Sequence, residues 1–219
     1  MMHYFKKLAY LLVLIGFSVA HAGSFEDFFT AIKRDNASDV RALLQRGFDG
    51  NTSNEQGLSG LFLAIKSESY KAADALLDWP QIAGETRNRK DESALMIAAL
   101  AGELDLCKKL IDKGADVNKV GWAPLHYAAT RGQVAVMRLL LDNDAYIDAV
   151  SPNGTTPLMM AARYGSIDAV RLLLDEGADP ALKNQQQLSA IDFAQLGVRP
   201  DAVTAISAAV RAKQPKGAW

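Results

Sequence analysis

Hydrophobic and polar positions repeat along the chain with a period of about 33 residues, which is typical of a repeat architecture. The first large apolar residue of each repeat lies at Phe28, Leu61, Leu95, Leu125, Leu158 and Ile191, evenly spaced except for a shorter interval between Leu95 and Leu125. Within a repeat, apolar residues recur every three or four positions in two short segments, as Ile167, Val170 and Leu174 do in one of them. This spacing is helical, so the pattern predicts six helix-turn-helix repeats after residue 22.

Residues with special backbone preferences mark the ends of the predicted helices. Thr156 followed by Pro157 forms an N-cap and a first helical position, at which the missing proline N–H is no loss. Gly47, Gly114 and Gly177 each follow a second helix, where glycine readily adopts the left-handed conformation that closes a helix. These residues place a turn after each helix and predict an all-α fold.

The repeated motifs resemble those of the ankyrin-repeat family. They are "APLHYAATRG", "TPLMMAARYG", "LLLDEGAD" and "KKLIDKGADVN", which match the family patterns T-P-L-H-x-A-A-x-x-G and L-L-x-x-G-A-D-x-N. The resemblance implies an ankyrin-repeat solenoid of about six helix-turn-helix repeats with short β-hairpin loops. The predicted repeats lie near residues 24–56, 57–90, 91–120, 121–153, 154–186 and 187–214, and residues 215–219 are predicted to form a flexible tail.

Two places break the register. Trp79 and Pro80 stand where other repeats have a glycine turn, and proline cannot adopt a positive φ, so the helix before them must end differently. The segment "NKVGWAPLH" is three residues shorter than its counterpart in the next repeat. Its hairpin must be clipped or absent, which leaves Trp122 at the tip of a short loop.

The first 22 residues have the pattern of a secretory signal peptide. Lys6 and Lys7 precede an uncharged apolar run from Leu8 to Ala20, and Ala20 and Ala22 supply the small residues of a cleavage site before Gly23. An uncleaved N-terminal anchor is the alternative, although the apolar run is short for a membrane span. We therefore expect a periplasmic or secreted protein with no membrane association after cleavage.

Charge gives no reason to expect nucleic acid as a ligand. Without Lys6 and Lys7, 22 Lys and Arg residues remain against 25 Asp and Glu, so the mature chain has a net charge of about −3. A chain that is acidic overall has no global attraction for nucleic acid or for an anionic membrane.

The sequence contains little material for catalysis. His126 is the only histidine after the leader, and Cys107 is the only cysteine. The resemblance implies that His126 hydrogen-bonds within its own turn, and the repeat register places no nucleophile or carboxylate beside it. Cys107 shares a repeat position with apolar residues and is predicted to be a buried thiol. We therefore expect no catalytic residues, no metal site and no cofactor.

The remaining candidate is a protein-binding surface on the concave face that the resemblance implies, formed by hairpin tips and the ends of first helices. The predicted contact residues are Lys66, Arg87, Arg89, Lys119, Trp122, Arg131, Asn153, Thr155, Arg163 and Tyr164. This set is basic and aromatic, as protein-interface anchors often are. An alternative is that these cations only lie at solvated helix ends, where they interact favourably with the helix dipole.

These features favour a non-catalytic adaptor or scaffold that binds a protein partner, for which an acidic surface would be complementary. We expect the protein to be a monomer. An accessory, inhibitor or immunity-type factor for one enzyme of the same compartment is the alternative. An enzyme in its own right is a third hypothesis, for which the sequence offers no set of nucleophile, base and oxyanion donors.

Overall fold

A computed structural model describes residues 23–213 of the chain. It divides into two compact units, Met1–Ile82 (unit 1) and Ala83–Trp219 (unit 2), and each is described by itself. The predicted signal peptide and the whole of the predicted tail lie outside the described residues. Among the residues that are described, no helix is both long enough and apolar enough to cross a membrane.

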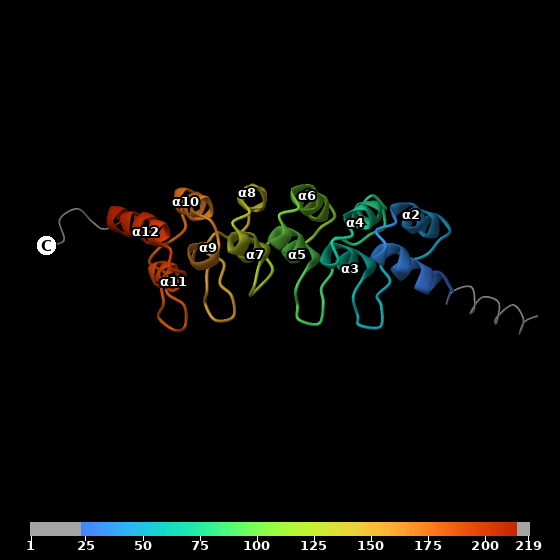
Figure 1. Cartoon of the computed structure of the whole chain (residues 1–219), viewed down its shortest axis with the longest axis horizontal. Coiled ribbons are helices and arrows are strands. Elements are labelled where there is room, and N and C mark those ends of the chain that lie inside the picture. Colours follow the sequence, from blue (N-terminus) through green and yellow to red (C-terminus); the bar gives the residue numbers. More distant parts are fainter. Residues whose placement is uncertain (1–22, 214–219) are drawn as a thin grey trace, which may run out of the picture. The chain divides into compact units, whose positions relative to one another are not determined.

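Unit 1 contains two helix pairs (Figure 1). The helices are a segment over residues 23–33, α2 (Ala37–Gln45), α3 (Gly60–Lys66) and α4 (Tyr70–Leu77). Its core consists of large side chains that are almost completely buried, among them Phe28, Ile32, Leu44, Leu61 and Phe62. Phe28 and Leu61 are the first large apolar residues of the first two repeats. The apolar residues that repeat along the sequence are therefore residues of the core.

Unit 2 contains four helix pairs (Figure 1). The helices are α5 (Ala94–Ala101), α6 (Leu104–Asp112), α7 (Pro124–Arg131), α8 (Val134–Asp142), α9 (Pro157–Tyr164), α10 (Ile167–Asp175), α11 (Ala190–Leu196) and α12 (Pro200–Lys213). The first helices of the pairs, called inner helices here, contact one another in the order α5, α7, α9 and α11, and the second helices form another layer. With the two pairs of unit 1, the predicted all-α fold of six helix-turn-helix repeats is confirmed.

The inner helices α3, α5, α9 and α11 begin at serine or threonine caps, whereas α7 begins at Ala123. The Ser93 hydroxyl accepts a hydrogen bond from the Met96 N–H, and the Met96 Sδ accepts one from the Ser93 N–H at 3.2 Å. Thr156 and Met159 form the same reciprocal pair. Methionine thus supplies the acceptor that the family pattern assigns to histidine.

The two register breaks have the predicted consequences. Helix α4 ends at Leu77 with Asp78 in a right-handed conformation, and no residue between 69 and 90 has a positive φ. Gly114, by contrast, follows α6 with φ +84°. In the short loop before α7, no bridge pair forms, whereas the loops before α5 and α11 contain the antiparallel bridges Arg87↔Ser93 and Lys183↔Ser189. The full-length loop before α9 has no bridge pair either, and the clipped hairpin is seen instead as a loop before α7 that projects less far than the other loops of unit 2 (Figure 1).

Cys107 on α6 is completely buried and has no disulfide partner. Burial, which disfavours the thiolate, raises the pKa of this thiol to about 12. The prediction of a buried core thiol is confirmed, and the side chain is not available for an intermolecular bridge in the folded protein.

Candidate protein-binding surface

His126, the third residue of α7, is bound on both sides by backbone groups. Its side chain is 0% exposed. The Ala123 N–H donates to Nδ1 at 3.2 Å, which fixes the tautomer, so Nε2–H donates to the Thr155 carbonyl oxygen at 3.0 Å. Burial is the main effect on its pKa and lowers it, which keeps the ring neutral. The predicted structural role is confirmed: His126 ties its own turn to the loop before α9.

A hollow lies on the exposed side of the inner helices, over His126. It has a volume of about 230 Å³ and is lined by Leu100, Trp122, His126, Tyr127, Thr130 and Met160. The walls come from the end of α5, the clipped loop, α7 and α9. The Trp122 ring meets the His126 ring edge to face, with centroids 5.2 Å apart. We call this site the Trp122 hollow.

Two arginines lie at the ends of the helices that form the hollow. Arg131 is the last residue of α7 and is exposed. Arg163 precedes the last residue of α9, and its guanidinium lies 4.9 Å from the centre of the Tyr164 ring, which is itself 53% exposed. Neither arginine has an ion-pair partner within residues 23–213, so both charges are available to a partner.

The structure corrects the placement of Lys119. This side chain is only 5% exposed, and its Nζ lies 2.5 Å from an Asp91 carboxylate oxygen and 2.9 Å from the Val120 carbonyl oxygen. Hydrogen bonds and charge from Lys119 and Arg87 lower the pKa of Asp91. The prediction that Lys119 is an exposed tip residue is wrong, because the clipped loop folds this side chain back onto the preceding hairpin.

Arg87 belongs to the same cluster of ion pairs. Its guanidinium lies 2.5 Å from Glu85, 3.2 Å from Asp91 and 3.5 Å from Asp116. Three carboxylates already compensate this charge, so Arg87 offers less free charge to a partner than Arg131, which has no ion pair within residues 23–213.

Thr155 is also misplaced by the sequence argument. It is buried, its N–H donates to the Ser151 hydroxyl, and its carbonyl accepts from His126. Asn153 is exposed, but its side-chain oxygen accepts from the Ser151 hydroxyl and its carbonyl accepts from the Gln185 N–H at 3.0 Å. The loop before α9 therefore uses these polar groups to hold its own shape.

The other two predicted residues, Lys66 and Arg89, are exposed. Lys66 ends α3 in unit 1, and Arg89 lies in the hairpin before α5 in unit 2. Sequence reasoning missed Tyr127 and Met160 as walls of the hollow. Each directly follows the histidine position of its repeat, and large side chains at that repeat position are the signal that could have found them.

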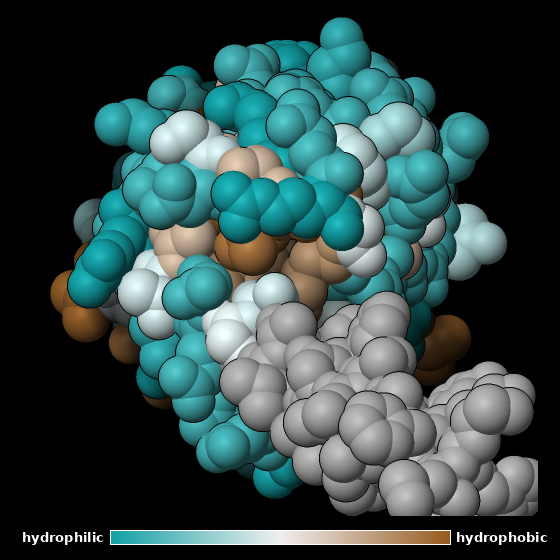
Figure 2. Space-filling model, turned by 90° about the vertical axis from the view of Figure 1, so that its right-hand side faces the viewer, coloured by the Kyte–Doolittle hydropathy of each residue, from teal (hydrophilic) through white to brown (hydrophobic). Residues whose placement is uncertain are grey.

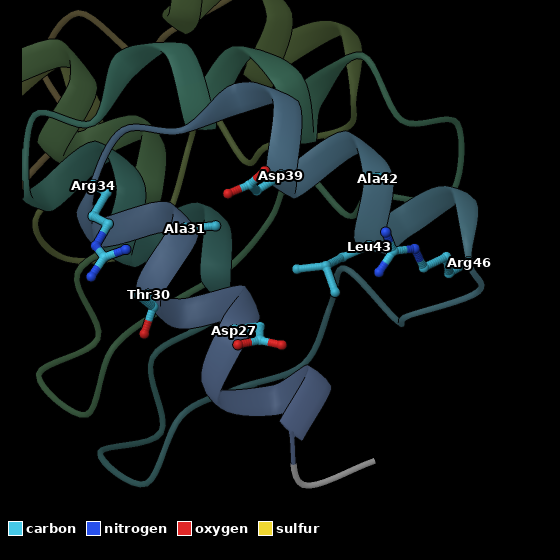
Figure 3. Close-up of a pocket in the computed structure, with 8 residues that line it drawn as sticks. All are labelled: Asp27, Thr30, Ala31, Arg34, Asp39, Ala42, Leu43 and Arg46. Carbon is cyan, nitrogen blue, oxygen red and sulfur yellow. The ribbon is translucent and has the colours of Figure 1, made fainter. Parts of the chain in front are cut away.

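A second hollow, of about 200 Å³, lies at the end of unit 1 between the helix over residues 23–33 and α2 (Figure 3). It is lined by Asp27, Thr30, Ala31, Arg34, Asp39, Ala42, Leu43 and Arg46. In Figure 2 a small apolar area at this end is framed by hydrophilic residues. A polar frame is typical of a terminal repeat, and no other repeat precedes this one within residues 23–213.

No group of three or more potential metal ligands comes together within residues 23–213. Both ring nitrogens of His126, the only histidine of that range, are hydrogen-bonded to backbone groups. The Trp122 hollow contains no carboxylate or thiol among its lining residues. What the site offers is an apolar depression with two cations beside it, a set suited to contact rather than to bond making.

Comparisons with known proteins agree with the architecture. A family model described as "Ankyrin repeats (3 copies)" matches residues 28–120 and again 95–184. The chain is 32% identical over 165 residues to the nuclear factor NF-kappa-B p105 subunit of Gallus gallus, which covers 72% of this chain and 17% of that protein. It is 28% identical over 121 residues to the putative ankyrin repeat protein YahD of Escherichia coli (strain K12), which covers 52% of this chain and 58% of that protein. The chain thus spans less than two thirds of either relative.

A solved structure gives a more extensive match. It is the predatory endopeptidase Bd0816 from Bdellovibrio bacteriovorus in complex with the immunity protein Bd3460. The matched chain is 26% identical to this one with a TM-score of 0.71, and the match covers 83% of this chain and 97% of that chain. The two chains are therefore similar over nearly the whole length of the solved one.

Proposed function

Because the chain belongs to the ankyrin-repeat family, whose repeats are protein-interaction modules, we propose that it binds a protein partner through the inner-helix surface of unit 2 and performs no catalysis. The observation that carries the proposal is the combination of the Trp122 hollow with Arg131 and Arg163 beside it. Unpaired cations next to exposed aromatic and apolar surface are typical of interface anchors. The binding unit is the monomer.

Favourable interaction with the helix dipole also accounts for a cation at the end of α7 or α9. It does not account for the clipped loop, for the hollow, or for Tyr164, whose ring lies under Arg163 and is more than half exposed. An exposed aromatic residue paired with an arginine contributes nothing to the core, whereas it provides large contact area at an interface. The binding interpretation explains all of these features together.

Reversal of the two free charges tests this proposal. We expect Arg131→Glu with Arg163→Glu to weaken partner binding at least about tenfold, since two interface charges would change from complementary to repulsive. The partner is first captured by crosslinking in a native periplasmic extract and identified by mass spectrometry. Binding of the purified partner is then measured by calorimetry.

Arg138→Glu with Arg171→Glu is the matched control, because it makes the same change in net charge on the exposed sides of α8 and α10. This control should bind like the wild-type chain. Partner binding that is unchanged by reversal of Arg131 and Arg163 would contradict the proposal.

A second candidate function is inhibition of one enzyme of the same compartment, as an immunity-type factor. The observation that favours it is the match to the endopeptidase–immunity protein complex, which extends over 97% of the matched chain. The leader-like pattern of residues 1–22 supports a periplasmic or secreted location for this chain and for its target.

The inhibitor hypothesis makes its own prediction. Added to the purified product of the adjacent open reading frame, the wild-type chain should suppress that enzyme's activity at an equimolar ratio. The chain with Arg131→Glu and Arg163→Glu should leave the activity intact. Tight binding without any loss of activity would favour an adaptor over an inhibitor.

A further inference from the structure

We propose that the Trp122 hollow receives a single large apolar side chain, of the phenylalanine or leucine class, from a partner segment that carries carboxylates on both sides of that residue. This inference rests on the proposed function and specifies the chemistry of the partner. It concerns one site in unit 2, at the place where the repeat array is three residues short.

Size determines the kind of occupant. The hollow has a volume of about 230 Å³, below the range of about 300 to 1,000 Å³ that is usual for small-molecule sites. It is open on the side of the inner-helix surface, and its walls include Leu100, Trp122 and Met160. One large side chain fits such a space, whereas a cofactor or a drug-sized ligand does not.

The polar groups of His126, Thr130 and Tyr127 in the walls already have hydrogen-bond partners. Both ring nitrogens of His126 bind backbone groups, and the Thr130 hydroxyl donates to the His126 carbonyl oxygen at 2.7 Å. The Tyr127 hydroxyl donates to Glu92 at 3.2 Å, and burial is the main cause that raises the pKa of this phenol to about 12. Of the wall side chains, only Trp122 keeps a donor, its indole N–H, that has no hydrogen bond within residues 23–213, so the rest of the wall presents apolar faces to the occupant.

Charge defines the flanks of the bound segment. Arg131 directly follows the wall residue Thr130, and Arg163 lies three residues after the wall residue Met160 on α9. Neither has an ion-pair partner within the described part of the chain. One carboxylate, Glu92, accepts hydrogen bonds from the wall residue Tyr127 and from the Asn88 side chain at 2.6 Å, and both of these donors are neutral. The two arginines outnumber this carboxylate, so carboxylates beside the inserted side chain complement the net positive charge of these groups.

Three blocked pentapeptides test the inference directly. The first is Glu-Asp-Phe-Asp-Glu, the second replaces its Phe by Gly, and the third is Lys-Lys-Phe-Lys-Lys. Each is titrated to millimolar concentration into the ¹⁵N-labelled full chain, and the Trp122 indole resonance is followed by NMR after assignment with Trp122→Phe. The Trp79 indole, in unit 1, is the internal control. We expect the acidic Phe peptide to shift the Trp122 signal and the other two to bind at least tenfold more weakly.

Two leucine variants distinguish binding in the hollow from binding to the surface around it. Leu100→Glu places a carboxylate in the wall, and we expect it to weaken the acidic Phe peptide at least tenfold. Leu104→Glu makes the same change at a leucine that is 41% exposed at the start of α6, and binding should be unchanged. Thermal unfolding of both variants confirms that each is folded.

The outcomes are distinct. Absence of a Trp122 shift with the acidic Phe peptide, or equal binding of the Phe and Gly peptides, overturns the inference. Suppose that a natural partner binds Leu100→Glu normally and fails to bind the chain with Arg131 and Arg163 reversed. That result would support the proposed function and refute only the insertion of a side chain into the Trp122 hollow. A partner that is insensitive to the arginine reversal refutes the proposed function itself.

Discussion

Gly165→Ala should destabilise unit 2 by about 3 kcal/mol, at the upper end of the usual range for overpacked sites. A β-carbon on Gly165 would lie 2.3 Å from the Ala129 carbonyl oxygen and 3.0 Å from the Ala161 Cα. Both are backbone atoms of helices, which cannot move aside as a flexible side chain can. The φ of Gly165 is −84°, a value open to any residue, so the expected loss is steric and not conformational.

Gly177→Ala provides the opposite case. Gly177 has φ +101°, and a β-carbon there would meet nothing within 4 Å. Its replacement should cost only backbone strain, about 1–2 kcal/mol. Urea unfolding of both variants, followed by circular dichroism, measures the difference. If Gly165→Ala were no more destabilising than Gly177→Ala, the close approach of α7 to residue 165 would not be limiting for stability.

This close approach explains why the sequence predicts the repeat stack so well. Inner helices carry paired alanines, such as Ala128 with Ala129 and Ala161 with Ala162, all of which are fully buried. Small side chains allow neighbouring backbones to come close, and large apolar residues fill the space between layers. Each requirement restricts residue type at a fixed position in the repeat. The spacing of these positions is therefore visible in the amino-acid sequence itself.

The clipped loop was predictable for a different reason. Its length follows from counting residues between Gly114 and Pro124 and comparing the count with the next repeat. The residue count does not show where the Lys119 side chain lies. Its ammonium group contacts Asp91 of the preceding hairpin. A lysine in a turn is normally solvated. Its burial depends on a pairing between two successive loops, which no local pattern in the sequence records.

The candidate site shows the same limit. Trp122, Arg131, Arg163 and Tyr164 were predicted because they occupy repeat positions that face the inner surface. The hollow itself arises only when the end of α5, the clipped loop and two inner helices meet. Helical periodicity specifies which face a side chain is on, but not whether neighbouring side chains fill the space between them.

The second substitution with a large expected effect on stability is at His126, the histidine position of the repeat. His126→Ala should destabilise the fold by about 2–4 kcal/mol, because it empties a fully buried site, leaves the Ala123 N–H unpaired and removes one of the two hydrogen bonds that the Thr155 carbonyl accepts, the other coming from the Ser151 N–H. His126→Met should cost only about 1 kcal/mol. Met96 and Met159 show that a methionine Sδ at this position accepts the same hydrogen bond from the residue three positions earlier. Only the bond to Thr155 would be lost.

Comparison of the wild-type chain with His126→Met isolates the contribution of His126 to the pH dependence of stability. Burial is the largest influence on its pKa and holds it below the usual 6.5, so the unfolded chain binds the proton more readily than the folded one. Stability from this group is complete above about pH 6.5 and is lost as the pH falls towards the folded-state pKa, by up to about 1.4 kcal/mol per pH unit. His126 is the only histidine within residues 23–213, and the carboxylates with lowered pKa, such as Asp91 and Asp192, are common to both chains. Urea unfolding between about pH 5 and 8 should therefore show wild-type stability falling relative to His126→Met as the pH decreases. A constant difference across that range would mean that the imidazole can take up a proton without loss of its two backbone contacts.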